Sequence, residues 1–126
     1  MGQKWKPEIQ SFKTNANLSA ASWHIVKYAA DDDIDVTSVQ GELMLGVLTD
    51  EVGEANTDDK FVDVQVGGIV KVEAGGAITG GTLVMSNNAG EAVAWSAGNY
   101  ALGQALHSAV DGEYVSVIYG PTSNAS

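Results

Sequence analysis

Apolar and polar residues alternate along several short segments of the chain, and a period of two is typical of β-strands. The clearest such segments are Phe61–Val66, Ile69–Glu73, Thr82–Met85, Glu91–Trp95 and Tyr114–Tyr119. The residues between the third and fourth segments, Ser86–Gly90, have the Asn and Gly composition of a hairpin loop. Few stretches keep the 3.6-residue period of a helix, so the pattern predicts a mainly β protein.

The apolar segments recur in the same order in the two halves of the chain. Trp23–Lys27 corresponds to Leu83–Ser86, Met44–Leu48 to Ala101–Leu106, and Phe61–Gly67 to Tyr114–Gly120. We therefore expect a small β-barrel or β-sandwich built from two similar halves that bury their apolar faces against each other. Paired glycines in Glu73–Gly81 indicate that this segment is the turn between the halves.

The first residues differ from the rest of the chain in charge. Residues 1–15 carry a formal +2, whereas residues 16–126 carry a formal −12. We expect an extended N-terminal arm at 1–17, a single β domain at 18–120, in keeping with a length of 126 residues, and a C-terminal tail at 121–126. The basic and apolar residues predicted to anchor the arm on a partner are Lys4, Trp5, Lys6, Pro7, Ile9, Phe12 and Lys13. The alternative is a frayed chain end.

Composition argues against several functions. A net charge of −10 and the absence of Arg argue against nucleic-acid binding and against the phosphate chemistry that guanidinium groups support. The chain has no apolar run of the roughly 18 residues that a membrane-spanning helix needs, so we expect no membrane contact. The polar N-terminus does not resemble a signal peptide. The absence of Cys excludes disulfides and thiolate zinc sites.

Candidate chemistry is sparse. Asp31–Asp35 contains four aspartates, but the sequence after it lacks the register of a calcium-binding EF-hand. A solvated acidic loop is the favoured interpretation, and cation binding there stays open. His24 and His107 are interpreted as packed or surface residues, and Ser108 beside His107 does not make a catalytic triad. We predict no enzymatic activity, no cofactor and no metal.

Trp23, Trp95 and Tyr100 are the aromatic residues that invite a functional interpretation. A β domain in which aromatics make up 7% of residues needs most of them for burial, so we expect core positions or a subunit interface. The alternative is an exposed platform that stacks on sugar rings.

The glycine pattern of the later part of the chain resembles that of bacteriophage capsid cement, or head-decoration, proteins. The segments that carry the resemblance are Gly67–Val72, Ala74–Gly81, Thr82–Met85, Gly90–Trp95, Leu102–Leu106 and Gly112–Gly120. Together they cover nearly half of the chain. The earlier half fits more loosely, and the N-terminal residues do not match by motif.

This resemblance implies a compact β module similar to the head-decoration protein of phage lambda. It implies a homotrimer at three-fold or quasi-three-fold positions on the outer surface of the virion's expanded shell, assembled in the host cytoplasm and bridging major capsid protein subunits. It implies no catalytic residues. We keep a second hypothesis open, a carbohydrate- or receptor-binding β module of a phage fiber or secreted protein.

Overall fold

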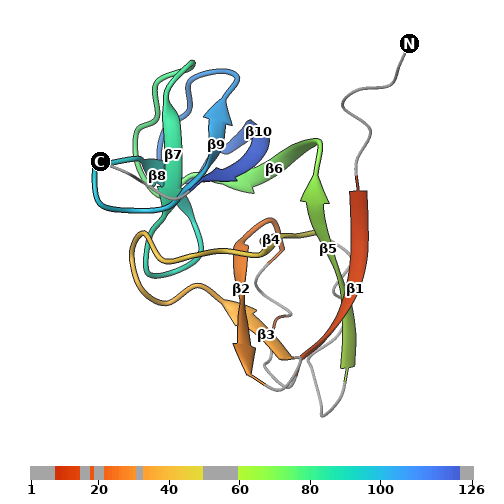
Figure 1. Cartoon of the computed structure of the whole chain (residues 1–126). Coiled ribbons are helices and arrows are strands. Elements are labelled where there is room, and N and C mark those ends of the chain that lie inside the picture. The colour runs from red at the N-terminus through yellow and green to blue at the C-terminus, as the bar shows by residue number, and fades with distance from the viewer. Residues whose placement is uncertain (1–7, 15–17, 19–21, 31–32, 50–59, 123–126) are drawn as a thin grey trace.

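The computed structural model describes residues 8–14, 18, 22–30, 33–49 and 60–122, and all regular structure within these ranges is β. The N-terminal half contributes β1 (Glu8–Thr14), β2 (Ile25–Ala30), β3 (Asp33–Val36), β4 (Gly46–Leu48) and β5 (Lys60–Gly67). The C-terminal half contributes β6 (Ile69–Glu73), β7 (Leu83–Ser86), β8 (Ala92–Ala94), β9 (Ala101–Ala105) and β10 (Tyr114–Thr122). Figure 1 shows the two sets as two groups, with β6 leading from one to the other. The predicted mainly β fold is confirmed.

The first five strands form a closed barrel in the order β1-β3-β2-β4-β5. β1 pairs antiparallel with β5 along its length, from Glu8 opposite Gly67 to Thr14 opposite Lys60. Its other edge pairs in parallel with β3, where Lys13 lies opposite Asp33. Because β1 has partners on both sides, the barrel leaves no open edge at this position.

The second five strands repeat this arrangement in the order β6-β10-β9-β7-β8. When β6–β10 are aligned with β1–β5, the strands have the same neighbours in both halves. The parallel pairing of β1 with β3 recurs as one isolated parallel bridge, between Ala74, just after β6, and Ala92, the first residue of β8. The predicted two similar halves are therefore present as two five-stranded units of the same topology.

A glycine at the same place in each unit explains the Leu-Gly repeat. A Cβ added to Gly46 in β4 would lie 2.5 Å from the carbonyl oxygen of Gln65 in β5. A Cβ added to Gly103 in β9 would overlap the carbonyl oxygen of Ile118 in β10. Both glycines let the strand approach the backbone of its paired neighbour closely, which a larger residue would prevent.

Each half has its own hydrophobic core, which corrects the expectation of one shared interior. The N-terminal core consists of Leu18, Val26, Ile34, Leu48, Val62 and Val64. The C-terminal core contains buried apolar residues of β6–β10 and of the segments between them, joined by Ile25, Met44 and Val47 from the N-terminal half. The first sheet encloses its core by closing into a barrel, whereas the second sheet packs its core partly against residues of the N-terminal half.

The boundary between the halves also differs from the expected one. It lies at Gly68, whose φ of 80° lets the chain leave β5 and enter β6. The expected boundary, Glu73–Gly81, begins at the last residue of β6 and connects it to β7 inside the C-terminal half. The prediction was wrong because β6 pairs with β10 rather than with β5.

The expectation of a separate N-terminal arm is wrong for residues 8–14. These residues form β1 and close the barrel through their pairing with β5 and β3. Residues 1–7 and 15–17 lie outside the described part of the chain. At the other end, β10 extends to Thr122, so the expected tail begins two residues too early, and residues 123–126 lie outside the description.

The expected acidic loop at Asp31–Asp35 is only partly correct. Asp33 begins β3, and Ile34 is 1% exposed and belongs to the N-terminal core. A strand forms here because Ile34 and Val36 alternate with aspartates that face away from the core. Asp31 and Asp32 lie outside the described residues.

Hydrogen bonds join the two halves. The backbone N–H of Ile25 donates to the carbonyl of Gly90 over 2.7 Å, and that of Glu73 donates to Trp23 over 2.9 Å. The buried hydroxyls of Thr37 and Ser86 also bond across the junction. The two units are thus fixed to each other by polar contacts as well as by apolar packing.

Candidate interaction surface

The residues predicted to anchor an N-terminal arm fall into two groups. Lys4, Trp5, Lys6 and Pro7 lie outside the described residues. Ile9, Phe12 and Lys13 lie in β1, where Ile9 is 49% exposed and Phe12 packs against the N-terminal core. The Nζ of Lys13 lies 3.3 Å from Asp33 Oδ1 of the same chain. Of these three, Ile9 presents the most surface to a partner.

The three aromatics predicted for the core or a subunit interface each have contacts within the chain. The Trp23 ring faces the Nζ of Lys71 at 4.7 Å from its centroid. The indole N–H of Trp95 donates to the carbonyl of Asn99 over 2.8 Å. Tyr100 packs against the C-terminal core. All three are partly buried, and their part in a subunit interface stays a prediction.

An apolar hollow lies beside β1 on the N-terminal barrel. It has a volume of about 340 Å³ and is lined by Ser11, Phe12, Lys13, Tyr28 and Phe61. Tyr28 and Phe61 are 60% and 66% exposed, which is unusual for aromatic side chains. This hollow can receive an apolar side chain between aromatic rings.

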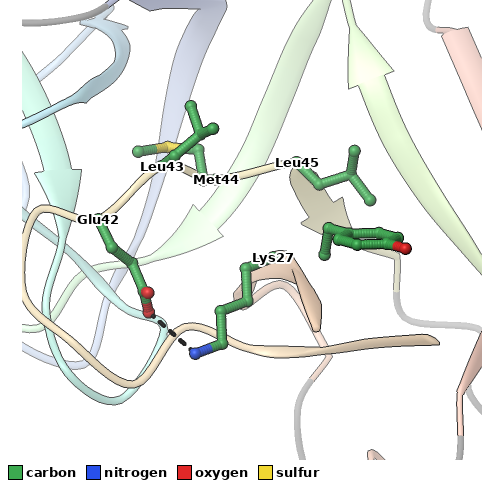
Figure 2. Close-up of a pocket in the computed structure, with 6 residues that line it drawn as sticks. Lys27, Glu42, Leu43, Met44 and Leu45 are labelled. Carbon is green, nitrogen blue, oxygen red and sulfur yellow. Dashed lines mark ion pairs between the residues drawn. The ribbon is translucent and has the colours of Figure 1, made fainter. Parts of the chain in front are cut away.

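Tyr28 also lines a second hollow. It has a volume of about 320 Å³ and is lined by Lys27, Tyr28, Glu42, Leu43, Met44 and Leu45. Figure 2 shows Leu43, Met44 and Leu45 along one segment of chain, with the ion pair of Lys27 and Glu42 beside them. Leu43 is 60% exposed. We call the two hollows together the Tyr28 surface, because this residue lines both.

The charged rim of the second hollow is held in a fixed arrangement. Glu42 Oε2 accepts hydrogen bonds from the backbone N–H groups of Ser38 and Val39 and lies 3.4 Å from Lys27 Nζ. Burial raises the pKa of the Glu42 carboxyl, but these backbone hydrogen bonds and Lys27 outweigh burial, so the pKa lies below its ordinary value. The carboxylate therefore stays ionised at neutral pH and holds the loop before Leu43 in place.

The sequence interpretation missed the Tyr28 surface, although the position of Phe61 on the polar side of an alternating strand indicated it. In β5 the side chains of Val62 and Val64 point into the barrel, so Phe61 shares the outer face with Asp63. An aromatic residue on the polar face of an alternating strand indicates an exposed contact site. Gln65 was expected on that wet face but is buried, because its amide donates to the carbonyls of Gly67 and Ile69.

The two histidines have different surroundings. His107 is exposed, and its ring nitrogens bond to the backbone of Ser108 and Ser116. His24 is partly buried and lies 3.9 Å from a carboxylate oxygen of Glu73 and 3.9 Å from one of Glu91. The sequence interpretation did not connect these residues, because they come from three distant segments.

Comparisons with known proteins give one informative result. No protein-family model matches the chain, and no curated protein matches it. Among solved structures, the chain is similar to the crystal structure of the head fiber gp8.5 N base in bacteriophage phi29, with a TM-score of 0.68 and 18% sequence identity. The match covers 94% of this chain and 99% of that chain, so the two share one fold over nearly their whole length.

In the described residues, no helix has the length and apolarity to cross a membrane.

Proposed function

We propose that this chain is a structural protein of a bacteriophage head that binds the outer surface of the shell. The observation that carries the proposal is the fold shared with the phi29 head fiber N base, which includes both halves of the chain. The glycine pattern that resembles capsid decoration proteins points the same way. The proposed role needs no catalysis and no cofactor.

The partner that we propose is the major capsid protein, bound through the Tyr28 surface. Tyr28, Leu43 and Phe61 are each at least 60% exposed and lie on the N-terminal barrel around two hollows. Exposed aromatic and apolar side chains around a hollow are typical of the centre of a protein interface, where they exclude water from the contact. Three copies at a three-fold position of the shell would multiply the strength of each contact.

Cosedimentation with purified phage shells tests this proposal. The wild-type protein should bind expanded shells up to a fixed copy number and should sediment with them. Phe61→Ser and Tyr28→Ser should each weaken binding at least about tenfold, because interface aromatics contribute most of the binding energy. Val110→Ser is the matched control, since Val110 is 56% exposed but lies in the C-terminal half, and its binding should equal that of the wild type.

Two results would count against this assignment. If the wild-type protein binds no shell at any concentration, the head-associated role is wrong. If it binds but all three variants bind equally well, the role stands and the Tyr28 surface is not the contact.

The second candidate, a sugar- or receptor-binding module, is favoured by a different observation. Tyr28 and Phe61 are exposed aromatic rings that line one hollow, and aromatic rings stack well on sugar faces. A glycan array separates the candidates, because a shell-binding protein should show no sugar preference. Binding of one glycan class that is lost in Phe61→Ser would favour the second candidate.

A further inference from the structure

Three potential metal ligands meet at the junction of the two halves. His24 precedes β2 in the N-terminal half, Glu73 ends β6, and Glu91 precedes β8. One nitrogen or oxygen atom from each residue lies within 4.8 Å of those of the other two. Their side chains are 14%, 28% and 27% exposed, so the cluster is shielded but open to an entering ion.

The imidazole of His24 is oriented as a ligand. Its Nδ1 lies 2.9 Å from the backbone carbonyl oxygen of Ser22. A carbonyl only accepts, so Nδ1 carries the hydrogen, and in the neutral ring the lone pair is on Nε2. Nε2 is the atom that faces Glu73 and Glu91. A hydrogen bond from the far nitrogen to a backbone carbonyl is the usual outer-shell support of a metal-binding histidine.

The two carboxylates are also held by their surroundings. Glu91 Oε1 accepts a hydrogen bond from the amide of Asn87 over 3.0 Å, while Oε2 faces His24. Glu73 is held beside His24 because its N–H donates to the carbonyl of Trp23. Trp23 adopts a φ of 64°, which is rare for a bulky residue and turns the chain so that His24 reaches this position.

The facing atoms are too far apart to hydrogen-bond to one another. A neutral Nε2 and two carboxylate oxygens are all acceptors, and the distance of 3.9 Å from Nε2 to each oxygen is longer than a hydrogen bond. Two metal–ligand bonds of about 2.1 Å each can span such a distance. A tetrahedral ion with bonds of this length holds its ligand atoms about 3.4 Å apart. The ligand atoms of the three residues lie within 4.8 Å of one another, so side-chain shifts of up to about 1 Å bring them to the ion.

We propose that His24, Glu73 and Glu91 bind one divalent transition-metal ion, of the Zn²⁺ class, that links the two halves of the protein. An imidazole with two carboxylates suits Zn²⁺, whereas Mg²⁺ and Ca²⁺ prefer sites made of oxygen alone. His24 belongs to the N-terminal half and both glutamates to the C-terminal half. The ion is therefore a structural link across the junction, and this inference does not depend on the proposed role on a phage head.

Untagged protein stripped with EDTA and then titrated with ZnCl₂ tests the site by calorimetry and thermal unfolding. We expect one Zn²⁺ per chain and a rise in Tm of at least about 5 °C at saturation, because an ion that binds the folded state alone stabilises it. MgCl₂ at the same concentration should give no rise. His24→Gln, Glu73→Gln and Glu91→Gln should each weaken Zn²⁺ binding at least about tenfold.

The melting temperatures of the variants without metal show whether a substitution removes a zinc ligand or damages the fold itself. Without metal, Glu73→Gln should melt at the same temperature as the wild type or higher, because it removes one of two neighbouring negative charges. His107→Gln is the control, since it removes the exposed histidine, and its Zn²⁺ titration should match that of the wild type. A wild-type Tm unchanged by Zn²⁺, or a Zn²⁺ effect that survives all three ligand variants, would overturn the proposal.

Discussion

The phenol of Tyr119 in β10 donates a hydrogen bond over 2.5 Å to the backbone carbonyl of Leu45, just before β4. The two residues belong to different halves of the protein and lie 74 positions apart in the chain. Tyr119 also packs against the C-terminal core, and Leu45 packs against the N-terminal core. This bond therefore ties together two units that each have their own interior.

We expect Tyr119→Phe to lower the free energy of unfolding by about 1–2 kcal/mol. The substitution keeps the ring but leaves the carbonyl of Leu45 without this donor in a partly buried position. Urea unfolding followed by tryptophan fluorescence measures the change. Tyr114→Phe is the control, because the Tyr114 ring faces Lys71 at 46% exposure, and its unfolding free energy should stay within about 0.5 kcal/mol of the wild type.

The same residue predicts a loss of stability at alkaline pH. Burial raises the pKa of Tyr119 to about 12. In the unfolded chain the phenol ionises near a pKa of about 10, so the unfolded state loses its proton first as the pH rises. The stability that the neutral phenol contributes is therefore complete below pH 10 and declines between about pH 10 and 12. The difference in urea midpoint between wild type and Tyr119→Phe should shrink over this range, and a constant difference up to pH 12 would contradict the assignment.

Gly46 and Gly103, which occupy the same place in the two halves, give a prediction about the repeated architecture. Gly46→Ala and Gly103→Ala should each lower the free energy of unfolding by more than about 2 kcal/mol, because the added methyl group meets the backbone of β5 or β10. Gly120→Ala is the matched control, since a Cβ there has nothing within 4 Å. Circular dichroism during thermal unfolding gives the comparison. If Gly103→Ala is as stable as Gly120→Ala, the close approach of paired strands is not the reason for the Leu-Gly repeat.

The strands that the sequence predicted correctly are those whose patterns depend on neighbours nearby in the chain. β5, β6 and β10 alternate in polarity. β7 and β8 flank a loop in which the side-chain oxygen Oδ1 of Asn87 accepts from the N–H groups of Ala89 and Glu91. The residues of β1 were assigned to an arm because residues 1–15 are basic and carry apolar side chains that suggested docking on a partner. Its place in the barrel depends on pairing with β5, more than 45 residues later, which local pattern does not reveal.

The candidate sites were harder to predict from the sequence, because they too depend on contacts between distant segments. Tyr28, Leu43 and Phe61 are ordinary apolar residues until the fold places them around two hollows. His24, Glu73 and Glu91 meet only because the fold brings the end of β6 and the start of β8 beside the start of β2. The repeat indicated that two units exist, but the chemistry at their junction required the pairing of strands across the whole chain.

Truncation from the N-terminus distinguishes an arm from a barrel strand. Because β1 begins at Glu8, removal of residues 1–7 leaves every described strand pair intact, and we expect a cooperative unfolding transition near that of the wild type. Removal of residues 1–14 deletes β1, exposes the edges of β3 and β5 and removes the buried hydroxyl of Thr14 that donates to Ile34. We expect this second protein to lose the cooperative transition of its N-terminal barrel. Hydrogen exchange measures the stability of both truncated proteins. Amides of β3 and β5 should exchange fast in the protein that lacks residues 1–14, and amides of β10 should exchange slowly in the protein that lacks residues 1–7. If both truncated proteins retain slow exchange in β5, then β1 is dispensable for the barrel and the independent-arm interpretation is restored.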